Sequence, residues 1–303
     1  MEELLVICRL VRMSVFETGE DIPTGVNWDR IFRMARNNGV SALCYEAVKR
    51  LPPASQPDSE LLRRWKLSAQ NIRGAFYYRH EVTRCLCDIL ERNGIRMLML
   101  RGETLADNYP EPELRESGEV DFVALPSHKA CHAYLEFLGV KVRSQRRQSS
   151  FVYKGVHFEN YMLKPVECFN SVYRRTMALL RKSLPQAVQR EDGCLMPEPV
   201  VQAIISIMHT ALHSSRSGGR VSLRMLLDLE LLLHNHPDIV DKWEPLLKEV
   251  GLYSFAQVML CATCQLLGTD RIPRLADAWN SRTRHRANRL IRSLAQSKFS
   301  GDC

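Results

Sequence analysis

Two acidic residues, Glu119 and Asp121, lie one residue apart in the otherwise apolar run 119–125. Alternate side chains of a strand point to the same face, so the two carboxylates converge while Val120 and Phe122 point to the opposite face. Like charges on one face of an apolar strand repel each other and lose hydration, and a bound cation relieves both costs. Carboxylate oxygens suit Mg²⁺, which typically binds one or two carboxylates together with substrate phosphates. The pair therefore indicates phosphoryl-transfer chemistry.

A third carboxylate, Glu159, lies in a later strand-like run, 156–163, from which it could face the pair across a sheet. Three acids on two strands can hold two metal ions, one lowering the pKa of an attacking hydroxyl and one stabilising a leaving pyrophosphate. Acid-x-acid pairs also occur at strand ends without any metal. The spacing alone therefore leaves a purely structural role open.

The elements that must position these acids follow from hydrophobic periodicity. Short apolar or alternating runs bounded by glycine or proline predict strands, at 95–100, 119–125, 140–143, 151–153 and 156–163. Helices are expected at 102–109 and at 127–138, the second with Ser127 as its N-cap and Gly139 as its stop. This order predicts a mixed sheet with covering helices.

Both flanks of this sheet are predicted to be helical. Helical spacing runs from Glu2 to about Val48 and from Ser59 to about Asn93, on either side of a proline-rich turn at 52–57. Later helices are expected at 200–214, 222–234, 238–250, 253–267 and from Asp277 onward. The predicted fold class is therefore α+β, with a small mixed β-sheet core at 94–196 between an N-terminal helical region at 1–93 and a C-terminal helical region at 197–303.

Length and composition are those of a globular protein. The 303 residues are 45% hydrophobic and 25% charged, which supplies a core without crosslinks. The ten cysteines are scattered through apolar helical patterns and are interpreted as buried thiols, including Cys261 and Cys264 despite their zinc-like spacing. Charges interrupt the apolar start of the chain, and no run of about eighteen uncharged apolar residues follows. We therefore expect neither a signal peptide nor a membrane partner, and a cytoplasmic location as the default.

The net charge of +8 is compatible with binding phosphates or a polyanion. The basic excess lies in a C-terminal group and in a central group: Arg282, Arg284, Arg286, Arg289, Arg292 and Lys298, and Lys141, Arg143, Arg146 and Arg147. We interpret the first as a solvated helix face and the second as a solvated hairpin. No aromatic residues interleave with the C-terminal group, so nucleic-acid binding through it ranks last among the functions considered.

The stretch 100–123, LRGETLADNYPEPELRESGEVDFV, resembles the core motif of a family of uncharacterised bacterial nucleotidyltransferases within the DNA polymerase beta nucleotidyltransferase superfamily. In that family a strand ending in Lys-Gly leads to a helix, a Tyr-Pro-x-Pro turn, an Arg and then Gly-Asp-Ile-Asp-Leu-Leu-Val. The matching positions here are Gly102, Tyr109, Pro110, Pro112, Arg115 and Asp121.

The resemblance extends from about residue 25 to about residue 270. Glu159 and Asn160 resemble the family's later acidic motif. His209, Arg224 and Asp228 lie where its helical C-terminal region tends to show a His, and an Arg a few residues before an Asp.

This resemblance implies a nucleotidyltransferase fold and a reaction that depends on Mg²⁺ or Mn²⁺. A nucleotidyl group would pass from a nucleoside triphosphate to an unknown acceptor, which could be a small molecule, a protein or RNA. Catalytic and metal-binding roles are implied for Glu119, Asp121 and Glu159. Nucleotide-binding roles are implied for Arg101, Gly102 and Arg115.

The sequence departs from the family pattern at three positions. Glu119 replaces the first aspartate, Arg101 replaces the lysine before the glycine, and Glu103 replaces the serine of the wider superfamily's Gly-Ser. These departures support an alternative function: a catalytically inactive protein of the same fold that senses nucleotides or binds partners through its helical C-terminal region.

Several polar residues have more than one interpretation. Arg115 either binds a phosphate in bidentate fashion or closes its loop by pairing with Glu113 or Glu119. His209 and His213 share a helix face, and we expect them to pack rather than to bind a metal. Arg224 and Asp228, also four apart, are expected to form an ion pair within one helix.

Overall fold

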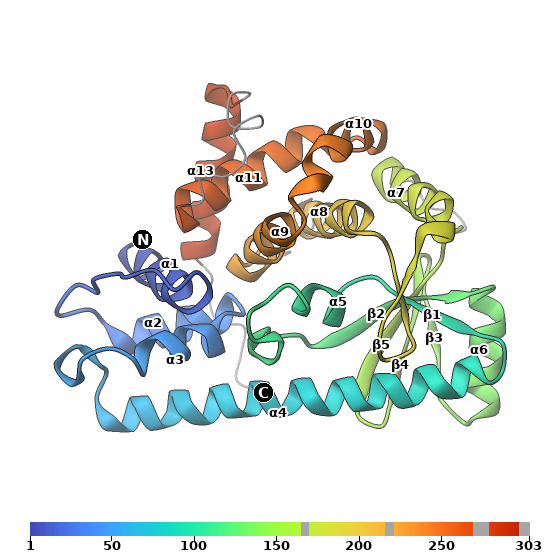
Figure 1. The fold of residues 1–303 in the computed structure, drawn as a ribbon, viewed down its shortest axis with the longest axis horizontal. Coiled ribbons are helices and arrows are strands. Elements are labelled where there is room, and N and C mark those ends of the chain that lie inside the picture. Colours follow the sequence, from blue (N-terminus) through green and yellow to red (C-terminus); the bar gives the residue numbers. More distant parts are fainter. Residues whose placement is uncertain (165–169, 216–220, 269–278, 297–303) are drawn as a thin grey trace.

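The computed structural model describes residues 1–164, 170–215, 221–268 and 279–296. Within them a seven-stranded mixed sheet has the strand order β3-β4-β5-β2-β1-β7-β6 (Figure 1). The strands are β1 (Arg96–Met99), β2 (Glu119–Leu125), β3 (Arg143–Ser144), β4 (Gln148–Tyr153), β5 (Val156–Tyr161), β6 (Val188–Gln189) and β7 (Leu195–Met196).

The central strands bring distant parts of the chain into register. β2 pairs antiparallel with β1 and parallel with β5, and β5 pairs antiparallel with β4. In the β2–β5 ladder Asp121 lies opposite Glu159, and Glu119 lies opposite His157. Because facing residues of adjacent strands point to the same side, the carboxylates of both strands share one face of the sheet.

The two faces of the sheet have different cores. One face packs on the long helix α4 (Ser59–Glu91) and on α6 (His128–Phe137), and its core contains Val120, Phe122 and Phe158. The opposite face contributes Leu98 and Val123 to a larger core that it shares with the N-terminal and C-terminal helices. The acids of β2 point to this second face.

The remaining helices surround that larger core. N-terminal to α4 lie α1 (Glu2–Val15), α2 (Trp28–Asn37) and α3 (Ser41–Val48), and the single-turn α5 (Glu103–Ala106) follows β1. The C-terminal helices are α7 (Ser171–Lys182), α8 (Pro199–Ser215), α9 (Leu223–Asn235), α10 (Val240–Val250), α11 (Tyr253–Leu267) and α13 (Ser281–Ala295). α7, α8 and α9 lie above the sheet, on the side away from α4 (Figure 1).

Side-chain caps explain where several helices begin. Asn27 accepts a hydrogen bond from the backbone N–H of Arg30 and starts α2, and Asp58 accepts one from Leu61 and starts α4. The Ser127 hydroxyl accepts from the Ala130 N–H and starts α6, as the sequence predicted. Such caps fix helix starts because the first N–H groups of a helix have no partner within it.

The predicted α+β class with a mixed sheet and helical flanks is confirmed. Three details differ: α7 and the two-residue strands β6 and β7 were not predicted, the strand expected at 140–143 is absent apart from Arg143, which begins β3, and the helix expected at 102–109 is a single turn. Pro110 and Pro112 follow that turn and lack the N–H groups that a longer helix would use. Asp277 lies outside the described residues, and α13 begins at Ser281. No helix in the described ranges combines the length and apolar character that a membrane crossing requires.

Candidate active site

The three acids singled out from the sequence meet at one place on the sheet. Glu119 and Asp121 extend from β2 and Glu159 from β5, and their carboxylate oxygens lie within 4.8 Å of one another. Asp121 is almost fully buried, and the other two are half-buried. Val120 and Phe122 lie in the core on the opposite face. The predicted convergence of the three carboxylates is therefore what the structure shows.

This acidic cluster is short of positive charge. Burial, together with the charges of Asp121 and Glu159, raises the pKa of Glu119 to about 7. One guanidinium balances the group, because Nη2 of Arg101 lies 2.8 Å from Oδ2 of Asp121. The Tyr161 hydroxyl donates a hydrogen bond of 2.9 Å to Oε2 of Glu159.

The residues of the cluster fit a divalent cation. Oδ1 of Asp121 is buried and has no hydrogen-bond partner among the described residues, although buried carboxylate oxygens are normally satisfied. Carboxylates are hard oxygen donors, the chemistry that Mg²⁺ and Mn²⁺ favour. A cation at Glu119, Asp121 and Glu159 would satisfy this oxygen and offset the repulsion that raises the pKa of Glu119.

The turn after β1 runs close beside the acidic cluster. Gly102 has φ of +79°, which residues with a side chain rarely adopt. A Cβ atom at this position would lie 3.4 Å from the backbone oxygen of Glu119. The backbone N–H of Leu100 also donates to the backbone carbonyl oxygen of Asp121 at 2.8 Å. Glycine is therefore required for the turn that places Arg101 against Asp121.

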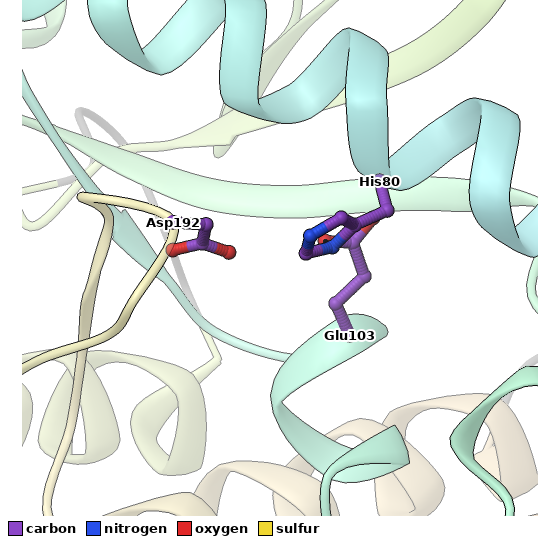
Figure 2. A group of neighbouring side chains, drawn as sticks. All are labelled: His80, Glu103 and Asp192. Atoms are coloured by element: carbon purple, nitrogen blue, oxygen red, sulfur yellow. Dashed lines mark hydrogen bonds and ion pairs between the residues drawn. The ribbon is translucent and has the colours of Figure 1, made fainter.

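Glu103 points toward His80 of α4 (Figure 2). Its Oε2 lies 3.2 Å from Nδ1 of His80, and the Thr83 hydroxyl donates to its Oε1 at 3.4 Å. Asp192 completes this second group, and Arg190 donates to it at 3.1 Å. The hydrogen bond to Glu103 raises the pKa of His80 above its usual value. The acid that replaces the superfamily serine therefore takes part in an ion-pair network on the other side of the turn.

Arg115 closes its loop through a partner that the sequence did not reveal. Its Nε and Nη2 donate to the two carboxylate oxygens of Asp228, at 2.7 and 2.8 Å, and the Tyr109 hydroxyl donates to the same carboxylate at 2.7 Å. All three side chains are buried. The expected pairing of Arg115 with Glu113 or Glu119 is wrong, because Glu113 pairs with Arg73.

The expected ion pair between Arg224 and Asp228 is also wrong. Arg224 donates instead to the backbone oxygen of Glu116, and Arg79 donates to that of Ser117 at 2.8 Å. Together with Arg115, two further arginines from α4 and α9 thus hold the loop that leads into β2. They fix the position at which the acid pair begins.

A cavity of about 190 Å³ lies beside the acidic cluster, between the sheet and the C-terminal helices. Glu119, Glu159 and Tyr161 line it from the sheet, and Tyr173 of α7 lines it from above. His209 and His213 of α8 also line it, with their ring centroids 4.2 Å apart. The two histidines were expected to pack within the helical region, and the structure places them at the cleft.

Arg147 also lines this cavity, from the residue just before β4. The interpretation of residues 141–147 as a wholly solvated hairpin is therefore wrong for Arg147, which is half-buried. One feature of the chain could have indicated this position for Arg147. β4 is the hairpin partner of the strand that carries Glu159, so residues at the start of β4 lie beside Tyr161 at the end of that strand. Tyr161 and Tyr173 carried no such signal.

A mixed sheet that presents clustered carboxylates to a helical region is the arrangement expected of a nucleotidyltransferase-type protein. The chain matches the family model described as "Uncharacterised nucleotidyltransferase" over residues 24–268, which is most of its length. It therefore belongs to that family, as the motif at 100–123 implied. Comparisons with curated proteins and with solved structures gave no match.

Proposed function

We propose that this protein transfers a nucleotidyl group from a nucleoside triphosphate to an acceptor, with Mg²⁺ or Mn²⁺ held by Glu119, Asp121 and Glu159. The observation that carries the proposal is the convergence of three carboxylates, one with a buried oxygen that has no hydrogen-bond partner in the described parts of the chain. Membership of a nucleotidyltransferase family supports the reaction class. The acceptor could be a small molecule, a protein or RNA.

When bound, the cation would supply the positive charge that activates an acceptor hydroxyl and stabilises a leaving pyrophosphate. The chain's own residues prepare the place for it. Tyr161 orients Glu159, and the pair formed by Arg115 and Asp228 fixes the loop before β2. Gly102 allows the backbone to approach the phosphates without a side chain in the way. Arg101 lines the cleft with its guanidinium buried against Asp121, where it offsets part of the negative charge that phosphates would meet.

Proton release accompanies cation binding in this scheme. Glu119, with a pKa of about 7, is partly protonated at neutral pH when no cation is bound. A cation would bind the ionised carboxylate and so would displace this proton to solvent. Affinity for the cation therefore rises with pH until the pH exceeds about 7.

A second function has one observation in its favour. The Arg101 guanidinium is buried against Asp121 and partly neutralises the acids without any metal. An ion pair that already offsets the acids suits a catalytically inactive protein that senses nucleotides or binds partners. The two functions differ in whether a cation is required for nucleotide binding.

The deciding experiment is calorimetric titration of ATP, GTP, CTP and UTP into the purified protein, with and without Mg²⁺. The same titrations on Asp121→Asn change one oxygen to an amide nitrogen and nearly preserve shape. Binding that needs Mg²⁺ and disappears in Asp121→Asn supports the transferase. Binding that is indifferent to both supports the sensor, and no binding by folded protein overturns both functions.

A further inference from the structure

The cleft holds a guanidinium that no described acid neutralises. Arg101 is committed to Asp121, and Arg115 is buried in its pair with Asp228. Arg147 lines the same cavity, and among the described residues no carboxylate lies within ion-pair distance of it. Arg101 and Arg115 each pair with an aspartate, whereas Arg147 lines the cleft without an acidic partner in the described ranges.

The surroundings hold Arg147 in place before any ligand arrives. Its backbone oxygen accepts hydrogen bonds from the Tyr173 hydroxyl at 3.2 Å and from the Met162 N–H at 2.9 Å. Its guanidinium carbon lies over the Tyr173 ring, 5.3 Å from the ring centroid. The hydrogen bonds fix the backbone and the ring supports the guanidinium, so the side chain loses less conformational freedom on binding than an exposed arginine would. A guanidinium also offers paired N–H groups that match two phosphate oxygens.

The size of the cavity limits what it can contain. At about 190 Å³ it is smaller than the roughly 300–1,000 Å³ of pockets that enclose whole small-molecule ligands. A phosphate chain fits such a space better than a complete nucleotide does. The acids at its floor would repel a polyphosphate, so cationic groups must also line the cavity if phosphates are to enter.

We infer that Arg147 binds the terminal phosphates of the substrate and thereby makes the cleft selective for triphosphates over monophosphates. This inference rests on the proposed function, because it places the polyphosphate of that substrate between the acidic cluster and α7. Arg147 acts as a specificity-determining residue: it contacts the phosphates that become pyrophosphate. The base and sugar lie nearer the mouth of the cavity.

The test compares Arg147→Ala and Arg147→Lys with the matched control Arg146→Ala, an exposed neighbour in the same loop. Calorimetry would measure the affinity of each protein for ATP, AMP and sodium tripolyphosphate in the presence of Mg²⁺. We expect Arg147→Ala to weaken binding of ATP and tripolyphosphate about tenfold or more, with AMP affinity unchanged. Arg147→Lys keeps the charge but loses the paired N–H groups, so its loss is smaller. Arg146→Ala behaves as wild type.

Two results would overturn the inference: ATP affinity unchanged in Arg147→Ala, or equal losses for ATP and AMP. The second result would mean that the substitution distorts the cleft, and circular dichroism would show whether the fold is intact. The proposed function can fail separately. If wild type binds tripolyphosphate through Arg147 but no nucleotide, the phosphate site stands and the nucleotidyl transfer does not. If Asp121→Asn abolishes ATP binding while Arg147→Ala has no effect, the transferase stands and the role of Arg147 is rejected.

Discussion

Two clusters of ionisable side chains lie on either side of the Gly102 turn. One contains Glu119, Asp121 and Glu159, and the other contains His80, Glu103 and Asp192. In both, possible metal-ligand atoms from three side chains lie within 4.8 Å of one another. Distance alone does not tell the two clusters apart.

Charge balance does tell them apart. In the second cluster His80 and Thr83 bind Glu103, and Arg190 together with the Cys194 N–H binds Asp192. In the acidic cluster three carboxylates share Arg101, and one buried oxygen has no partner in the described chain. A satisfied network stabilises the fold, whereas an unsatisfied group of acids is the one that gains from a cation. The comparison therefore favours the acidic cluster over the second cluster as the place of the proposed metal, and the second cluster has the contacts of a structural network.

The largest expected effect comes from matched changes of one aspartate in each cluster. Asp121→Asn should lower Mg²⁺-dependent turnover by about a thousandfold, roughly 4 kcal/mol. Until an acceptor is known, the same loss is expected in the Mg²⁺-dependent affinity for the nucleotide. Asp192→Asn should leave it within a few fold, because that carboxylate lies outside the cleft. Comparable losses in the two variants, both shown to be folded, would contradict the distinction between the clusters.

The next effect is on stability, and here the second cluster rather than the acidic cluster should be the sensitive one. Glu103→Ala removes the carboxylate that pairs with His80 and lies 4.0 Å from the buried Arg79. Because both basic groups then lack their acid, the substitution should lower the free energy of unfolding by roughly 3 kcal/mol. Urea denaturation would measure this. Glu136→Ala is the control, because the Glu136 carboxylate is largely exposed and its pair with His132 should contribute under about 1 kcal/mol. Affinity for Mg²⁺ should not change in either variant. A stable Glu103→Ala protein would show that the second cluster is not a structural network.

Adding a cation should stabilise the protein through the acidic cluster only. At a concentration one hundred times its dissociation constant, Mg²⁺ should raise the free energy of unfolding by about 2.7 kcal/mol. The measurement is thermal unfolding with Mg²⁺ or with a chelator, in wild type, Asp121→Asn and His80→Gln. We expect stabilisation in wild type and His80→Gln and none in Asp121→Asn. Loss of the response in His80→Gln would indicate that Mg²⁺ binds at His80, Glu103 and Asp192 instead.

The smallest effect is the pH dependence of the metal-free protein. The fold raises the pKa of Glu119 to about 7, because it disfavours the ionised carboxylate. The free energy of unfolding of wild type is therefore highest below the ordinary carboxylate pKa, where Glu119 is protonated, and falls as the pH rises to about 7. Glu119→Gln removes this loss. Its melting temperature should equal that of wild type near pH 4 and exceed it by about 2–4 °C at pH 8, because solvent screening limits the effect to about 1 kcal/mol. The reverse order at pH 8 would mean that Glu119 gains more from Arg101 than it loses by burial.

Local patterns made much of the site predictable. The two-residue period of a strand places Glu119 and Asp121 on one face, and the apolar residues between and after them identify the strand itself. Gly102 marked the turn, and the motif at 100–123 identified the family. Ser127 and the glycine stops gave the bounds of α6 to within about a residue.

Contacts between distant residues were not predictable in this way. Arg115 and Asp228 are 113 positions apart, and each has nearer opposite charges that the sequence made equally plausible. β6 and β7 contain two residues each, too few to show a period. Arg147 belongs to a run of basic residues that differ only in where the fold places them, so composition could not separate it from its exposed neighbours.

The length of α4 has a mechanical consequence for the cleft. Its 33 residues make a beam about 50 Å long, which runs beneath both the N-terminal helices and the sheet (Figure 1). Arg79 and His80, on this helix, hold the loop before β2 and the start of α5. The sheet side of the cleft is thus held by a long, stiff helix, whereas its opposite side is formed by α7 and α8. The acids on the sheet therefore keep a fixed position relative to α4, and a change in the width of the cleft would require movement of α7 and α8 rather than of the sheet.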